Sequence, residues 1–187
     1  MDAFSYLTVL LSIIIGLAIT QVLKGVRGLM QGRSRLRVYW PAIVWAALVL
    51  VIAVQSWWAM FGMRIHREWT FFEFSVLLAQ AILIYLLAAL VLPDFFGETK
   101  VDLRAHYFGH HRWFFALSIL LIAVSIGKEY MLEGRLPYAT NLSFQLSFAA
   151  GGVCGMASRD ERVHAVLTIV SAILIFAYIG VLFVHLE

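Results

Sequence analysis

The residues best suited to chemistry in this chain are ionisable and amide side chains set within long apolar runs. Glu73 lies in such a run, with Phe71 and Phe72 before it and Phe74 after it, and Gln80 follows seven residues later. If the segment is helical, both side chains lie on one face. A carboxylate is costly to bury in a membrane and therefore indicates function by default. We expect Glu73 to be a protonatable or cation-binding group.

Hydrogen-bonding side chains recur at a similar depth in the neighbouring apolar runs. They are Gln55, Gln80, Lys128, Glu129, Asn141 and Gln145. Two interpretations remain open. In the first, these residues and Glu73 line a water-accessible polar cavity in the outer half of the bundle, as a pathway for an ion or a substrate. In the second, Glu73 reaches the lipid headgroups or pairs with Lys128, and the amides only join helices, since an interhelical polar bond contributes about 0.6–2 kcal/mol.

A second cluster follows a helical spacing between two of the apolar runs. Asp102, His106 and His110 are four residues apart, so a helix would place all three on one face. Imidazole and carboxylate groups in this arrangement can bind zinc or another divalent ion. The same segment mixes apolar and charged residues, which is typical of a helix in the membrane interface. The sequence is therefore compatible with a metal site at these residues or with a helix in the membrane interface.

Other chemistry is not indicated. The single cysteine, Cys154, excludes an intramolecular disulfide and four-cysteine metal sites. A haem in the membrane needs axial histidines inside facing helices, but His66, His164 and His185 lie at the ends of apolar runs. The chain has neither a glycine-rich phosphate loop after a strand nor a Gly-x-Ser-x-Gly motif. We therefore predict no cofactor, and an enzyme is not favoured.

The elements that must position these residues follow from the composition. Of 187 residues, 63% are hydrophobic and 13% are charged, whereas soluble domains are about 45–50% apolar and about 25% charged. About 20 apolar residues cross a bilayer. Six apolar runs cover residues 6–23, 39–63, 71–92, 113–126, 138–157 and 163–186, approximately. The sequence predicts an all-α, polytopic membrane protein, with one six-helix transmembrane domain over residues 1–187.

The distribution of Lys and Arg predicts the orientation. The connections 24–38, 96–112 and 158–163 contain ten of these residues, and the remaining four of the fourteen lie on the other side. Because cytoplasmic loops are enriched in Lys and Arg, the first set should face the cytoplasm and both termini should not. The sequence pI of about 9.2 reflects this excess of basic residues. Because membrane topology accounts for them, we predict no nucleic-acid partner.

The expected assembly and function follow from this small bundle. Gly151 and Gly155 are four residues apart in the fifth run, which predicts close packing near the bundle centre. With little soluble mass, the chain is expected to form a homo-oligomer in a lipid bilayer, with the bacterial inner membrane as the expected location. We predict a channel or transporter for a cation, a proton or a small polar solute. The alternative is a non-transporting membrane module that binds a lipid or a partner protein.

Overall fold

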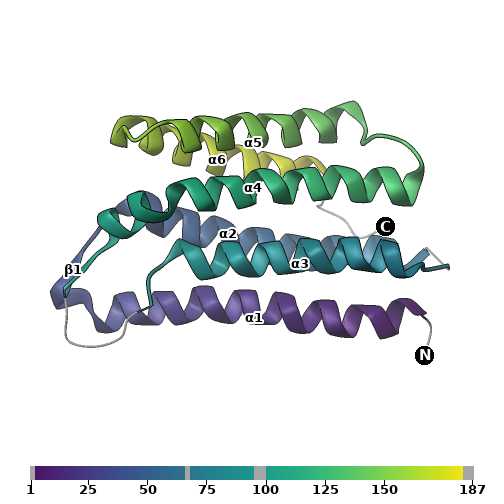
Figure 1. Ribbon diagram of the computed structural model, residues 1–187, viewed down its shortest axis with the longest axis horizontal. Coiled ribbons are helices and arrows are strands. Elements are labelled where there is room, and N and C mark those ends of the chain that lie inside the picture. Colours follow the sequence, from purple (N-terminus) through teal and green to yellow (C-terminus); the bar gives the residue numbers. More distant parts are fainter. Residues whose placement is uncertain (1–2, 66–67, 95–99, 183–187) are drawn as a thin grey trace.

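The computed structural model describes residues 3–65, 68–94 and 100–182, and they are nearly all helical. Six α-helices run alternately in opposite directions, so that α1 begins and α6 ends at the same end of the bundle (Figure 1). The helices are α1 (Ala3–Gln31), α2 (Trp40–Met60), α3 (Phe71–Val91), α4 (Leu103–Glu133), α5 (Ala139–Ala157) and α6 (Glu161–Leu182). Two 3₁₀ turns, η1 (Arg33–Arg35) and η2 (Phe61–Ile65), follow α1 and α2.

Five of these helices are long and apolar enough to cross a membrane: α1, α2, α3, α4 and α6. The chain is therefore a helical protein of the multi-pass membrane type. Helix α5 has 19 residues and is not among the five. Its sequence contains Asn141, Ser143, Gln145 and Ser147, which lower its mean hydropathy.

Two short strands mark one end of the bundle. Strand β1 (Leu36–Arg37) precedes α2, strand β2 (Val101–Asp102) precedes α4, and the two pair in parallel. We call this end the strand end, and the opposite end, where α1 begins and α6 ends, the terminal end (Figure 1). The described parts of the predicted connections 24–38, 96–112 and 158–163 all lie at the strand end.

Local sequence signals explain where the helices begin and end. Pro41 occupies the first turn of α2, where a missing N–H is tolerated. The side chain of Asp102 accepts hydrogen bonds from two backbone N–H groups at the start of α4. Helix α4 ends at Gly134, whose φ of 68° is left-handed and favours glycine.

Helix α4 is longer than the apolar run that predicted it. It covers 31 residues, whereas the run covers residues 113–126, so part of the predicted 96–112 connection is helical. The extra turns place Leu103, Tyr107 and His111 on one buried face at four-residue intervals. Hydropathy alone misses these turns because the opposite face of the same segment is charged.

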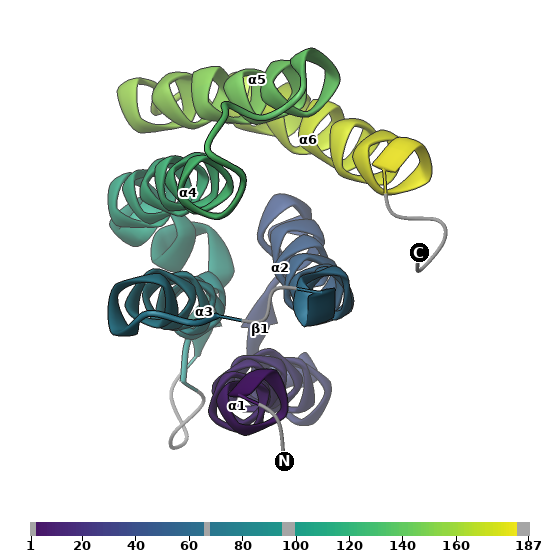
Figure 2. The ribbon, with the colours of Figure 1, turned by 90° about the vertical axis from the view of Figure 1, so that its right-hand side faces the viewer.

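The end view shows how the helices are arranged (Figure 2). Helix α1 lies at one edge against α2 and α3, α4 lies between α3 and α5, and α5 with α6 forms the other edge. The predicted central position of the fifth helix is therefore wrong. Two of its glycines, Gly152 and Gly155, lie against Ile119 and Phe115 of α4, and Gly151 lies against Leu167 of α6.

Candidate functional site

A chamber of about 140 Å³ lies inside the bundle, between α2, α3, α4, α5 and α6. Its wall is largely apolar and aromatic, with Trp45, Phe114, Phe115 and Phe148 among its rings. The polar residues on the wall are Gln55, Ser56, Gln80, Ser118, Ser125, Gln145, Ser171 and Tyr178. Mostly apolar walls with a few polar groups are typical of small-molecule sites.

A second, smaller cavity of about 70 Å³ adjoins the chamber towards the terminal end. It shares Gln55, Gln80 and Tyr178 with the chamber, and it adds Lys128 and Glu129. We call it the charged side cavity. The neutral chamber therefore lies next to a cavity that contains two charged residues near the end of α4.

Glu129 is held by amides from the neighbouring helix. Asn141 Nδ2 donates to both carboxylate oxygens of Glu129 at 2.8 and 2.9 Å. Gln145 Nε2 donates to Glu129 Oε1 at 3.4 Å and to Asn141 Oδ1 at 3.2 Å. Hydrogen bonds to a carboxylate are stronger than those between neutral groups, so this network fixes α5 against α4.

The same network determines which way the Gln145 amide points. Because its nitrogen must donate to Glu129, its oxygen faces away from the carboxylate. Gln145 is only 5% exposed, and its Oε1 has no hydrogen-bond partner among the described residues. Gln80 Oε1 is likewise buried and unpartnered there. Two buried acceptors thus belong to side chains on the chamber wall.

Lys128 lies next to Glu129 in the chain but has a different setting. It is half-buried and lines the charged side cavity. Within the described part of the chain, no ion pair of 4 Å or less joins its Nζ to a carboxylate. The side cavity therefore contains an ammonium and a carboxylate without a direct salt bridge between them.

The structure brings six of the seven predicted pathway residues together and separates Glu73 from them. Gln55, Gln80, Gln145, Lys128 and Glu129 line the two cavities, and Asn141 binds Glu129. Glu73 lines neither cavity. Its Oε2 instead accepts hydrogen bonds from the backbone N–H and the hydroxyl of Thr70, at 2.7 and 2.9 Å, in a capping box that begins α3.

Aromatic rings close the chamber towards the strand end. Trp45 of α2 makes edge contacts with Phe114 and Phe115 of α4, at centroid distances of 5.3 and 5.5 Å. Phe115 and Trp45 are both buried. These three rings therefore form the wall of the chamber on the side nearer the strand end.

Behind these rings lies a buried histidine cluster that the sequence patterns did not indicate. His164 is 0% exposed and His111 is 2% exposed, and their rings are 5.6 Å apart. His164 Nε2 lies 3.1 Å from the Ser158 carbonyl, so it carries the proton and donates. His164 Nδ1 consequently accepts a hydrogen bond from the Tyr107 hydroxyl at 2.9 Å.

His111 has one satisfied and one unsatisfied ring nitrogen. Its Nδ1 donates to the Phe108 carbonyl at 2.8 Å, which leaves Nε2 as a buried acceptor with no partner among the described residues. His66 and His185, which the sequence places at the ends of apolar runs, lie outside the described residues. His111 belongs to α4 and His164 to α6, so their edge-to-face ring contact brings together two helices that are far apart in the sequence.

The predicted metal site is not assembled. Asp102 caps α4 and accepts a hydrogen bond from Arg37, while His106 Nε2 donates to the Leu90 carbonyl at 3.0 Å. His110 Nδ1 donates to the His106 carbonyl, so its ring follows its own helix. No group of three or more His, Cys, Asp or Glu side chains in the described residues could hold a metal ion.

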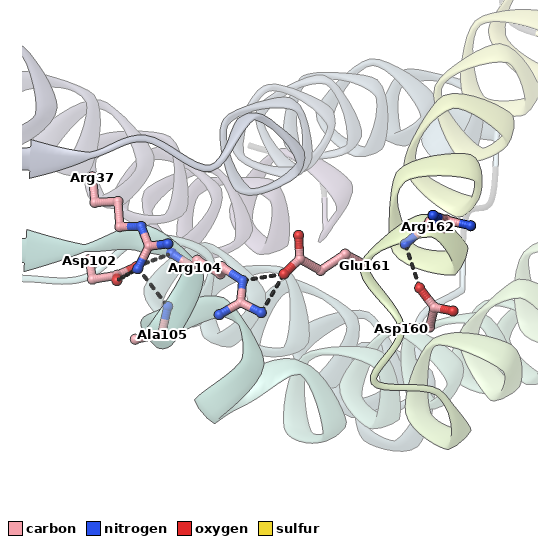
Figure 3. Close-up of polar contacts among 7 residues, drawn as sticks. All are labelled: Arg37, Asp102, Arg104, Ala105, Asp160, Glu161 and Arg162. Atoms are coloured by element: carbon pink, nitrogen blue, oxygen red, sulfur yellow. Dashed lines mark hydrogen bonds and ion pairs between the residues drawn. The ribbon is translucent and has the colours of Figure 1, made fainter.

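Ion pairs tie the helices together at the strand end instead (Figure 3). Arg37 binds Asp102 at 3.1 Å, and Arg104 of α4 binds Glu161 at the start of α6. The backbone N–H of Ala105, together with Arg37, holds the pKa of Asp102 below its usual range. Asp160 accepts a hydrogen bond from the Arg162 N–H and so begins α6.

Comparisons with known proteins do not identify a family. No protein-family model, no curated protein sequence and no solved structure matches this chain.

Proposed function

We propose that the protein is a membrane carrier for a small polar solute, with Glu129 as the group that couples transport to a proton or a cation. The observation that carries this proposal is the chamber, which is lined by residues of five helices and adjoined by the charged side cavity. Polar and ionisable residues are expensive inside a bilayer and commonly mark a substrate or ion pathway. Gln55 and Gln80 line both of the adjoining cavities, and Lys128 and Glu129 line the charged side cavity.

A carrier is favoured over an open channel because the space is closed at one side. The rings of Trp45, Phe114 and Phe115 lie between the chamber and the strand end. A carrier exposes its site to one side of the membrane at a time, and a chamber near mid-bundle with one closed side fits that behaviour. The Lys and Arg distribution supports a cytoplasmic strand end, so that the charged side cavity faces outward.

Helix α5 belongs to this proposal as a sixth membrane-crossing helix. It runs alongside α4 and α6 (Figure 1), and its Asn141 and Gln145 are directed at Glu129 rather than at lipid. Its lower hydropathy is therefore explained by polar residues that bind inside the bundle. A helix of 19 residues spans about 28 Å, close to the hydrocarbon thickness of a bilayer.

The test is flux through the purified protein in liposomes. Entry of protons and of K⁺ is followed with indicator dyes under an imposed potential, and entry of glycerol is followed by light scattering. We expect the wild type to accelerate at least one of these fluxes, and we expect Glu129→Gln to reduce it at least tenfold. The glutamine can still accept from Asn141 Nδ2, so this substitution removes the charge while keeping the contact between α4 and α5.

Glu73→Gln is the matched control. Glutamine at the third position of a helix preserves a capping box, so this variant loses a charge of the same sign outside the two cavities. It should retain the wild-type flux. A flux lost equally in both variants would contradict the role of Glu129, and no flux of any probe in the wild type would contradict the carrier and favour the lipid-binding or protein-binding module.

A further inference from the structure

We infer that the chamber binds an uncharged organic molecule with a body about the size of a benzene ring and one hydrogen-bond donor. This inference rests on the proposed function and specifies the substrate class of the same site. The volume of the chamber, about 140 Å³, sets the size. A cavity of about 150 Å³ with apolar walls is known to hold benzene.

The walls determine the chemical nature of the molecule's body. Rings of Trp45, Phe114, Phe115 and Phe148 form much of the surface, together with aliphatic side chains from α2, α4 and α6. Aromatic pairs gain from offset and edge contacts in addition to the area they bury. Among small polar solutes, one with an apolar and preferably aromatic body therefore fits this surface better than a sugar.

The lack of charge on the chamber wall favours an uncharged ligand. None of the described residues that line the chamber is Asp, Glu, Lys, Arg or His. A charged head group would lose its hydration without a counter-ion in contact. At the charged side cavity it would meet Lys128 and Glu129 together, so that either sign of charge would be attracted by one and repelled by the other.

The two unpartnered amide oxygens indicate the donor. Gln145 Oε1 and Gln80 Oε1 are buried acceptors on residues of the chamber wall. The Gln145 assignment is fixed by Glu129, which requires the nitrogen on its own side. The Ser118 hydroxyl offers no donor in return, because it donates to the Phe114 carbonyl at 2.8 Å. A ligand O–H or N–H would satisfy an oxygen that is otherwise left without a partner.

Three small probes of closely matched size test this inference by equilibrium binding. Phenol carries a neutral donor, toluene replaces that donor with a methyl group, and cyclohexylamine is a cation at neutral pH. Saturable binding is measured by equilibrium dialysis of protein in liposomes, with protein-free liposomes of the same composition to subtract partitioning. We expect one saturable phenol site per chain, with phenol bound about fivefold more tightly than toluene after that correction, and no saturable cyclohexylamine.

Variants locate the binding in the chamber. Gln145→Met and Gln80→Met each remove an amide with little change in volume, and we expect the preference for phenol over toluene to fall about fivefold in at least one of them. Gln80→Met leaves the Glu129 network untouched, so it remains informative if Gln145→Met fails to fold. Gln31→Met, at the exposed end of α1, is the matched control and should keep the wild-type preference.

Each other outcome overturns the inference. Equal affinity for phenol and toluene would show that no donor is recognised, and tighter binding of cyclohexylamine would show a cation site. No saturable binding of any probe would show that the chamber holds only water or lipid. Because the binding assay does not depend on flux, loss of phenol binding with intact Glu129-dependent flux would reject this substrate class alone. Phenol binding without any flux would reject the carrier alone.

Discussion

The hydroxyl of Tyr107 and the imidazole of His164 form a buried polar pair. Each partner lies on a different helix, and the His164 ring has both of its nitrogens satisfied. A buried histidine with two partners is held in one tautomer and one orientation. The pair therefore joins α4 to α6 immediately behind the aromatic wall of the chamber.

Replacing Tyr107 with Phe should destabilise the protein. The substitution preserves the ring contacts but leaves His164 Nδ1 buried without a partner, at a cost of about 1–3 kcal/mol. Thermal unfolding in detergent micelles measures the effect. Tyr130→Phe, at an exposed position of α4, is the control and should change the melting temperature little. An equally small effect at Tyr107 would show that the hydrogen bond contributes nothing to stability.

Glu73 and the histidine cluster show what sequence patterns can establish about single residues. The apolar surroundings of Glu73 made it the leading site residue, yet Thr70-Phe-Phe-Glu73 is also a capping-box pattern, and the structure uses it as one. Hydropathy reports the depth of a residue but not which face of its helix carries it. The histidine cluster had only the four-residue repeat of Leu103, Tyr107 and His111 as a signal, because its partner on α6 is far away in the sequence.

At the scale of elements, close helix packing depends on where a glycine faces. A Cβ on Gly155 would lie 2.6–2.7 Å from three ring atoms of Phe115, whereas a Cβ on Gly16 would meet nothing within 4 Å. The predicted close approach at Gly155 is therefore present between α5 and α4. Ser12, Gly16 and Thr20 of α1 are also four residues apart, but no helix packs closely against Gly16 in the described residues. Spacing alone therefore does not show whether a glycine faces a neighbouring helix.

These two glycines give a matched pair of substitutions. Gly155→Ala should destabilise the protein by about 1–3 kcal/mol, because Phe115 is buried against Trp45 and cannot move freely. Gly16→Ala should stabilise α1 slightly, by up to about 1 kcal/mol, through helix propensity. Urea or thermal unfolding of the two variants in the same micelles measures the difference. Opposite signs are expected, and two changes of the same sign would contradict this account of α4–α5 packing.

At the scale of the whole molecule, alternating helices bring the basic connections to one end. The helical class and the presence of membrane-spanning helices follow from composition and hydropathy. The position of α5 does not, because its polar residues reduce the signal by which spans are recognised, and their partner Glu129 is on another helix. The approximate positions of the helices along the chain and the gathering of several polar residues could be predicted from the apolar runs, but which helices pack side by side could not.

Labelling of single cysteines tests the proposed topology. With Cys154 replaced by Ser, cysteines are introduced singly at the exposed positions Ser34, Leu136 and Arg159. If α5 crosses the membrane, an impermeant thiol reagent applied to intact cells should label Leu136→Cys. The reagent should label Ser34→Cys and Arg159→Cys only after the cells are permeabilised. Labelling of Leu136→Cys and Arg159→Cys from the same side would show that α5 does not cross.

The parallel pair of β1 and β2 has a consequence for how the protein is made. Leu36 pairs with Val101 and Arg37 with Asp102, so the connection after α1 is fastened to the start of α4 while the ribosome still has α5 and α6 to deliver. The first four helices can therefore take up their relative positions before α5 and α6 are synthesised. Until α5 arrives, however, Glu129 lacks the amides of Asn141 and Gln145, and its carboxylate is left uncompensated. The arrival of α5 therefore supplies the hydrogen bonds that Glu129 lacks in a nascent chain ending before it.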